Sequence, residues 1–177
     1  YYSKLSKSIF MQTTAHNIQP VISQTEKNTT LWIGHLQTDS KDHDAGQTFT
    51  APGDGTINNI QVYSTLVQNP GDVSLSLHEF DSENKTWGPA IAHANVFLQK
   101  GDVARWIRFY LQPVSLKKNA SYAFRLHSDT ALIGIGEAAS NAHKPFATGQ
   151  EWKGDVDSGK GYFFKYFNLA FKVEMIA

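Results

Sequence analysis

The chain has 177 residues, enough for one domain with a sizeable core, and its lack of cysteine excludes disulfides, thiolate zinc sites and cysteine nucleophiles. Its 16 basic residues balance its 16 acidic ones, so no electrostatic footprint for nucleic acid or an anionic membrane is present. No hydrophobic run reaches the length of a membrane span, and we expect no membrane insertion.

Residues 1–30 are predicted to form an N-terminal arm whose structure the sequence leaves open. Leu5, Ile9 and Phe10 would share one face of a helix, but residues 13–20 interrupt the pattern. A short helix, an edge strand and an arm that orders on a partner all remain as alternatives. Residues 31–177 are predicted to form a single β-sandwich domain.

The domain shows short strands separated by turn residues. Val73, Leu75 and Leu77 alternate with polar side chains, which is the period of a half-buried strand. About nine strands at regular spacing, without any βαβ rhythm, predict an all-β antiparallel β-sandwich. We expect a jelly roll whose first and last strands pair. The predicted strands cover residues 31–36, 46–51, 56–65, 73–80, 92–98, 106–111, 122–127, 131–136 and 162–175.

The segment 104–128 is predicted to be a strand, a turn at Asn119 and a second strand, forming a hairpin. One set of alternating side chains is aliphatic and aromatic, as expected of a sandwich core. The other set contains more aromatic and charged side chains than a face that only contacts water requires, and it is a candidate binding face. It consists of Trp106, Arg108, Tyr110, Arg125 and His127.

Three stretches carry a resemblance to a known group of proteins: GQTFTAPGDGTINNIQVY, DVSLSLHEFD and WIRFYLQPVSLKKNASYAFRL. In these stretches the chain resembles the bacterial jelly-roll carbohydrate-binding modules and galactose-binding-like domains. The shared features are framework turns and strands, with Asn119 at a turn position where such patterns often have glycine. The resemblance implies the fold more than the ligand, and no ligand residue carries over from it.

The aromatic residues are the first candidates for ligand binding. The apolar faces of sugar rings stack on aromatic planes, while their hydroxyl groups need polar partners. Trp87 and Trp152 lie in predicted loops, where Trp152 is expected either to be exposed or to anchor the long segment 137–161. Trp106 could belong to the hairpin face or to the core, and Trp32 is interpreted as a core residue.

The acidic loop 38–44 is the second candidate site. Asp39, Asp42 and Asp44 could provide oxygen ligands for a structural calcium ion. The spacing does not match an EF-hand loop, and a solvated turn is the alternative interpretation. We expect no other cofactor.

A catalytic site is the third candidate, and the sequence provides no motif for one. None of the seven histidines has the spacing of a zinc protease or a deaminase. Glu79, Glu137 and Glu151 could supply the carboxylates of a glycosidase, but nothing in the sequence pairs them. No residue is therefore predicted to be catalytic.

These observations favour a non-catalytic binding module, with a glycan or another cell-surface molecule as its ligand. We expect a bacterial protein that is secreted, periplasmic or on the cell surface. A structural or adhesion module that binds protein or its own copies, as a homo-oligomer, is the first alternative. A lyase-like enzyme with a site of histidine, arginine and tyrosine is the second.

Overall fold

The structure, a computed structural model, describes residues 17–140, 143–155 and 161–176. In these ranges fourteen antiparallel strands form one curled sheet, which confirms the all-β prediction. No helix in the same ranges is long and apolar enough to cross a membrane. The strands are β1 (Ile18–Gln24), β2 (Thr29–His35), β3 (Asp42–Thr50), β4 (Gly55–Asn69), β5 (Gly71–Asp81), β6 (Thr86–Leu98), β7 (Arg105–Tyr110), β8 (Ser115–Leu116), β9 (Ser121–His127), β10 (Leu132–Ala139), β11 (Glu151–Asp155), β12 (Gly161–Phe164), β13 (Phe167–Leu169) and β14 (Phe171–Ile176).

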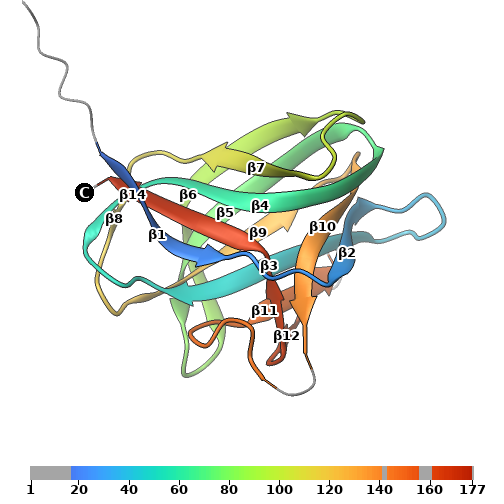
Figure 1. Ribbon diagram of the computed structural model, residues 1–177. Helices are drawn as coiled ribbons and strands as arrows, with labels where there is room; N and C mark the ends of the chain where they lie inside the picture. Colours follow the sequence, from blue (N-terminus) through green and yellow to red (C-terminus); the bar gives the residue numbers. More distant parts are fainter. Residues whose placement is uncertain (1–16, 141–142, 156–160, 177) are drawn as a thin grey trace, which may run out of the picture.

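The sheet curls so that two halves enclose the core (Figure 1). One half contains β1, β14, β4 and β7, and the other contains β3, β9, β5 and β6, while β10 and β2 connect them. The ring of Phe171 in β14 contacts both Phe49 in β3 and Phe124 in β9, so the halves pack directly on each other. The first and last described strands, β1 and β14, pair with each other, whereas the strand expected to be first, β2, pairs with β10 and β3. The jelly-roll topology itself stays a prediction.

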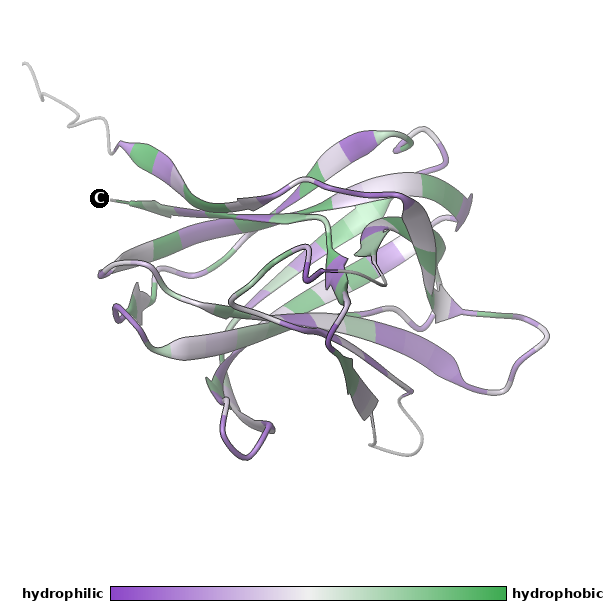
Figure 2. Ribbon diagram, turned by 60° about the horizontal axis from the view of Figure 1, so that its bottom comes forward, coloured by the Kyte–Doolittle hydropathy of each residue, from purple (hydrophilic) through white to green (hydrophobic). Residues whose placement is uncertain are grey.

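Alternating side chains build this core, as the sequence indicates. Val73, Leu75 and Leu77 of β5 are fully buried, and so is Phe109 of β7. Figure 2 shows hydrophilic and hydrophobic residues alternating along the strands. Trp32 is an exception: it was expected in the core but is 40% exposed, because it lies on the outward face of β2 opposite Gly134.

The predicted hairpin over residues 104–128 is wrong. β7 pairs with β4, whereas β9 pairs with β3 and β5, so the two strands belong to different halves of the sheet. The connection between them passes through β8 and a turn at Asn119, whose positive φ of 66° confirms its expected left-handed conformation. The candidate binding face is consequently divided into two separate surfaces.

Three predicted loops contain strand residues. β3 begins at Asp42, within the expected acidic loop. Trp87 lies in β6 rather than at a loop tip, and β11 lies within the segment 137–161. The strand conformation of β11 depends on its pairing with β3, which is distant in the sequence, and with β12, which follows after a loop. Its own residues therefore show no long alternating pattern.

Both ends of the described chain also differ in detail from the expectation. Residues 18–24 form β1, which is an edge strand paired with β14, and β2 begins at Thr29. The residues on which the alternatives for the arm rest, Leu5, Ile9 and Phe10, lie outside the described residues. The final predicted strand is divided into β12, β13 and β14, since Lys165 and Tyr166 form a turn.

Candidate functional site

A groove of about 500 Å³ lies where β6 and β7 face each other across the two halves of the sheet. In the described chain β6 pairs only with β5, and β7 pairs only with β4. The groove therefore lies between two strand edges with which no further described strand pairs. Its wall combines aromatic, charged and amide side chains: Gln61, Phe97, Asp102, Arg105, Trp106, Arg108 and Tyr110.

Two aromatic rings of this groove are open to solvent. Tyr110 is 64% exposed and Phe97 is 56% exposed, which are high values for side chains of this size. Both lie on the outward face of their strands, next to buried neighbours such as Phe109 and Leu98. The rigid sheet thus holds the two rings at the surface, where their faces are available to a ligand.

The turn between β6 and β7 is organised by the carboxylate of Asp102. Its Oδ2 accepts a hydrogen bond from the backbone N–H of Gln99 (2.8 Å), and its Oδ1 accepts one from Nη1 of Arg105 (2.8 Å). Ala104 completes the turn with a positive φ of 54°. One side chain therefore fixes the path of the chain and also places the Arg105 guanidinium beside the groove.

A ladder of polar and aromatic side chains continues from the groove across β4 and β14. Arg108 donates from Nη2 to Oε1 of Glu174 (3.0 Å), and Gln61 donates to the same oxygen (2.6 Å). The ammonium group of Lys172 lies 4.2 Å from the ring centroid of Trp106, so one face of this indole is occupied. Trp106 is half-buried, whereas Tyr110 stays largely exposed, with the Arg108 guanidinium 5.8 Å from its ring centroid.

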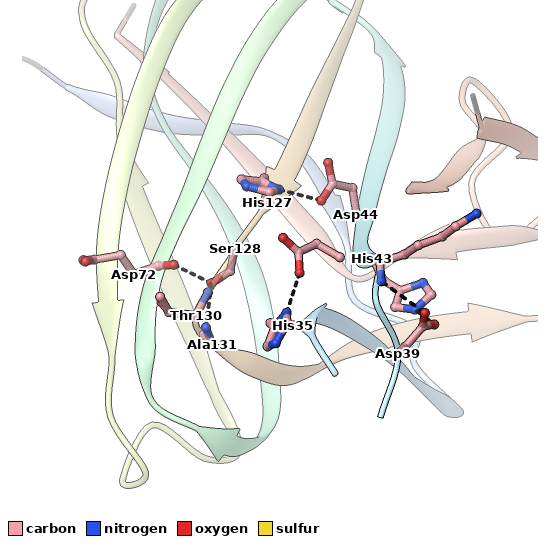
Figure 3. Close-up of polar contacts among 11 residues, drawn as sticks. His35, Asp39, His43, Asp44, Asp72, His127, Ser128, Thr130 and Ala131 are labelled. Carbon is pink, nitrogen blue, oxygen red and sulfur yellow. Dashed lines mark hydrogen bonds and ion pairs between the residues drawn. The ribbon is translucent and has the colours of Figure 1, made fainter. Parts of the chain in front are cut away.

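Arg125 and His127 lie on the other half of the sheet, around the carboxylate of Asp44. Arg125 donates from Nε to Oδ2 of Asp44 (2.7 Å), and its Nη2 lies 2.6 Å from the same oxygen. Nδ1 of His127 lies 2.8 Å from Oδ1 of Asp44 (Figure 3). The Asp44 side chain is only 1% exposed, while those of Arg125 and His127 are about one-third exposed. The structure therefore does not bring Arg125 and His127 together with Tyr110.

The indoles of Trp152 and Trp87 pack beside this network and are not offered to solvent as a pair. Trp152 is 5% exposed, and its ring lies beneath the Arg125 guanidinium at 4.8 Å and against Trp87 at 5.4 Å. A Cβ at Gly46 would lie 2.7 Å from the backbone oxygen of Phe124 and 3.1 Å from Trp87, so glycine allows the close approach of these strands and of the indole. Of the two alternatives for Trp152, exposure is thus wrong for the described structure, and anchoring of its segment is what the structure shows.

The three aspartates of the expected calcium loop each face a different basic partner (Figure 3). Oδ1 of Asp42 lies 2.7 Å from Nδ1 of His35, and Oδ2 of Asp39 lies 2.9 Å from Nε2 of His43. The hydrogen bond from His43 and that from the backbone of Lys41 hold the pKa of Asp39 below its usual value. Among the described residues no three such side chains are grouped as metal ligands, and calcium binding stays a prediction.

Replacing Asp44 with alanine is expected to lower the free energy of unfolding by about 1–3 kcal/mol, because two partly buried basic groups lose their carboxylate. Urea denaturation measures the change. Asp39→Ala is the matched control, since Asp39 pairs with a histidine from the same loop but is solvent-exposed, and its removal should have no measurable effect. Equal losses in both variants would contradict a special role for Asp44.

Sequence reasoning identified Trp106, Arg108 and Tyr110 but missed the rest of the groove. Phe97 was part of a predicted strand, and its outward position follows from the inward position of Leu98. An aromatic residue on the outward face of a strand could therefore have indicated that Phe97 belongs to a binding surface. No sequence pattern indicates Asp102 and Arg105, because their position at the groove depends on the β6–β7 turn.

The site thus consists of an open aromatic groove and a separate, largely buried polar network, both on an all-β antiparallel fold. The resemblance to carbohydrate-binding modules is supported only as far as this class of fold. No protein-family model matches the chain, and no curated protein matches its sequence.

Proposed function

We propose that the protein is a non-catalytic binding module that holds a glycan in the groove between β6 and β7. The observation that carries the proposal is the pair of exposed rings, Phe97 and Tyr110, beside charged and amide side chains in one groove. The rings would stack on the apolar faces of sugar units, and Arg105, Arg108 and Gln61 would bind their hydroxyl groups.

The geometry favours binding of an extended chain rather than a small buried ligand. The groove is open along two strand edges, and all of its lining side chains except Asp102 come from strands of the sheet. A preformed surface loses little conformational entropy when it binds. We further propose a jelly-roll module outside the bacterial cell, where polysaccharides are the accessible ligands.

Binding isotherms against a panel of soluble polysaccharides test the proposal. Tyr110→Ala and Phe97→Ala should each weaken binding roughly tenfold, which corresponds to about 1.4 kcal/mol, because each removes a stacking surface. Tyr162→Ala is the matched control: Tyr162 is 72% exposed but lies on β12, away from the groove lining, and its loss should leave affinity unchanged.

Two results would count against this function. One is the absence of binding to every polysaccharide of the panel by the folded wild-type protein. The other is a ligand whose affinity falls equally in the Tyr162 control and in the groove variants, since that pattern indicates adsorption to exposed tyrosines in general.

The free edges of β6 and β7 favour a second candidate, a module that binds protein or a second copy of itself. Unpaired strand edges accept an additional strand through main-chain hydrogen bonds. Here the backbone N–H of His93 already bonds to Oε1 of Gln112 (2.8 Å), which covers one such position of β6. Light scattering of the full chain distinguishes the two: a concentration-dependent dimer without polysaccharide binding supports self-association.

A further inference from the structure

Lys153 and two glutamates form a buried cluster between β10 and β11, away from the groove. The ammonium nitrogen of Lys153 lies 3.0 Å from Oε2 of Glu137 and 3.4 Å from Oε2 of Glu151. The side chains of Glu137 and Glu151 are 4% and 0% exposed. Glu151 and Lys153 point to the same side of β11, while Glu137 reaches them from β10. The sequence offered these glutamates as unpaired carboxylates, and the fold brings them together.

Aromatic rings enclose the lysine side chain of this cluster. Nζ of Lys153 lies 4.5 Å from the ring centroid of Phe167 and 5.0 Å from that of Phe164. The Lys153 side chain is 29% exposed, so water has only limited access to its amine. Such an environment disfavours a permanent buried ion pair, since the loss of hydration of both charges must be offset.

The polar atoms of the cluster are poorly satisfied. Among the described residues, Oε2 of Glu137 and both carboxyl oxygens of Glu151 have no hydrogen-bond partner, and their contacts with Lys153 are at ion-pair distance. Within the same part of the chain, Nδ2 of the fully buried Asn168 is also without a partner. Burial, together with the neighbouring Glu137 carboxyl, raises the pKa of Glu151 to about 10, so Glu151 is a carboxylic acid at neutral pH.

We propose that Lys153 and Glu137 react with each other to form an isopeptide bond that links β11 to β10. The Lys153 ammonium first passes a proton to the Glu137 carboxylate. The neutral Nζ then attacks Cδ of the resulting carboxylic acid, the new C–N bond forms, and the C–OH bond breaks. The ammonium and the carboxylate together become one neutral amide and one water molecule, so no oxidant or other reactant is needed. The 3.0 Å contact between Nζ of Lys153 and Oε2 of Glu137 holds the amine beside the carboxyl group whose carbon it attacks.

Glu151 is the acid of this reaction. It donates its proton to the oxygen that leaves as water and recovers a proton from the attacking nitrogen, so its own state is unchanged at the end. The product replaces the buried Glu137 charge and the partly exposed Lys153 charge by one amide N–H and one C=O, which cost less to bury. The bond also closes the chain between Glu137 and Lys153 into a loop. Such a loop lowers the conformational entropy of the unfolded chain, as a disulfide does.

Intact-mass spectrometry of the purified, folded full chain tests the proposal. The wild-type protein should be lighter than its sequence by one water molecule. After trypsin digestion, the bond after Lys153 should remain uncut, and fragment spectra should lack breaks between residues 137 and 153. A folded wild-type protein with the full sequence mass and normal cleavage after Lys153 would overturn the proposal.

Four variants separate the cross-link from a purely ionic cluster. Lys153→Arg keeps the charge but cannot form the amide, and Glu151→Gln removes the acid; both should have their full sequence mass. Glu137→Gln keeps an electrophilic carbonyl and should lose ammonia instead of water, a change that an ion pair cannot produce. Lys41→Arg is the control, because Lys41 pairs with Asp155 at the surface and its substitution should leave the water loss intact. Loss of water that persists in Lys153→Arg would place the modification elsewhere and contradict the assignment.

Discussion

Replacing Trp152 with alanine is expected to lower the free energy of unfolding by about 3–5 kcal/mol, the cost of removing a large buried aromatic side chain. The ring packs against Trp87, and the Arg125 guanidinium lies over it. Without the indole, a cavity opens where β11 meets β3, and the anchor of the segment after residue 140 is lost. Chemical denaturation followed by circular dichroism measures the change.

Trp32→Ala provides the matched control for this variant. Trp32 lies on the outward face of β2 and is 40% exposed, so its removal leaves little cavity, and the loss should be much smaller than for Trp152. Equal stability of Trp152→Ala and Trp32→Ala would contradict the conclusion that the buried indole of Trp152 stabilises the region where β11 meets β3.

Replacing Glu151 with glutamine is expected to change the pH dependence of stability. The folded-state pKa of Glu151 is raised by burial to about 10, above its ordinary value of 4.5. Between these values the folded protein holds a proton that the unfolded chain has released, so the free energy of unfolding falls as pH rises. The fall attributable to this group is at most roughly 1.4 kcal/mol per pH unit, or about 4 kcal/mol from pH 5 to pH 8.

The measurement compares the slopes of unfolding free energy against pH in a Lys153→Arg background, where the proposed amide bond forms in neither protein. Adding Glu151→Gln should remove the downward slope that the Lys153→Arg protein shows above pH 4.5. Glu79→Gln in the same background serves as the control, since Glu79 is exposed, and it should keep that slope. Parallel curves for the Lys153→Arg proteins with and without Glu151→Gln would show that Glu151 is ionised in the folded protein.

The sequence was sufficient to predict the fold class because alternation determines which side chains are buried. Leu75, Phe109 and Phe124 each follow the expected period and are fully buried. It was not sufficient to predict which strands pair. β7 and β9 satisfy the pattern of a hairpin, yet pairing of each with strands distant in the sequence overrides their proximity along the chain.

The candidate site was predictable only in part, and for the same reason. Tyr110 could be recognised as outward-facing from its own strand, but Phe97 joins it only because β6 and β7 border one groove. Glu137 and Glu151 are 14 residues apart in the sequence, and no local pattern indicates that β10 and β11 bring their carboxyl groups to one lysine. Contacts of this kind depend on the tertiary fold, which periodicity does not encode.

The position of β14 has a consequence for the order in which the protein can fold during synthesis. β14 lies between β1 and β4 and pairs with both (Figure 1). Until residues 171–176 have been synthesised, the strand that joins β1 to β4 is therefore absent. Until then the ring of Phe171, which joins the two halves of the core, is also missing. Cotranslational folding can therefore produce only partial structures, and the closure of the core waits for the last strand, as expected for a β topology with mostly non-local pairings.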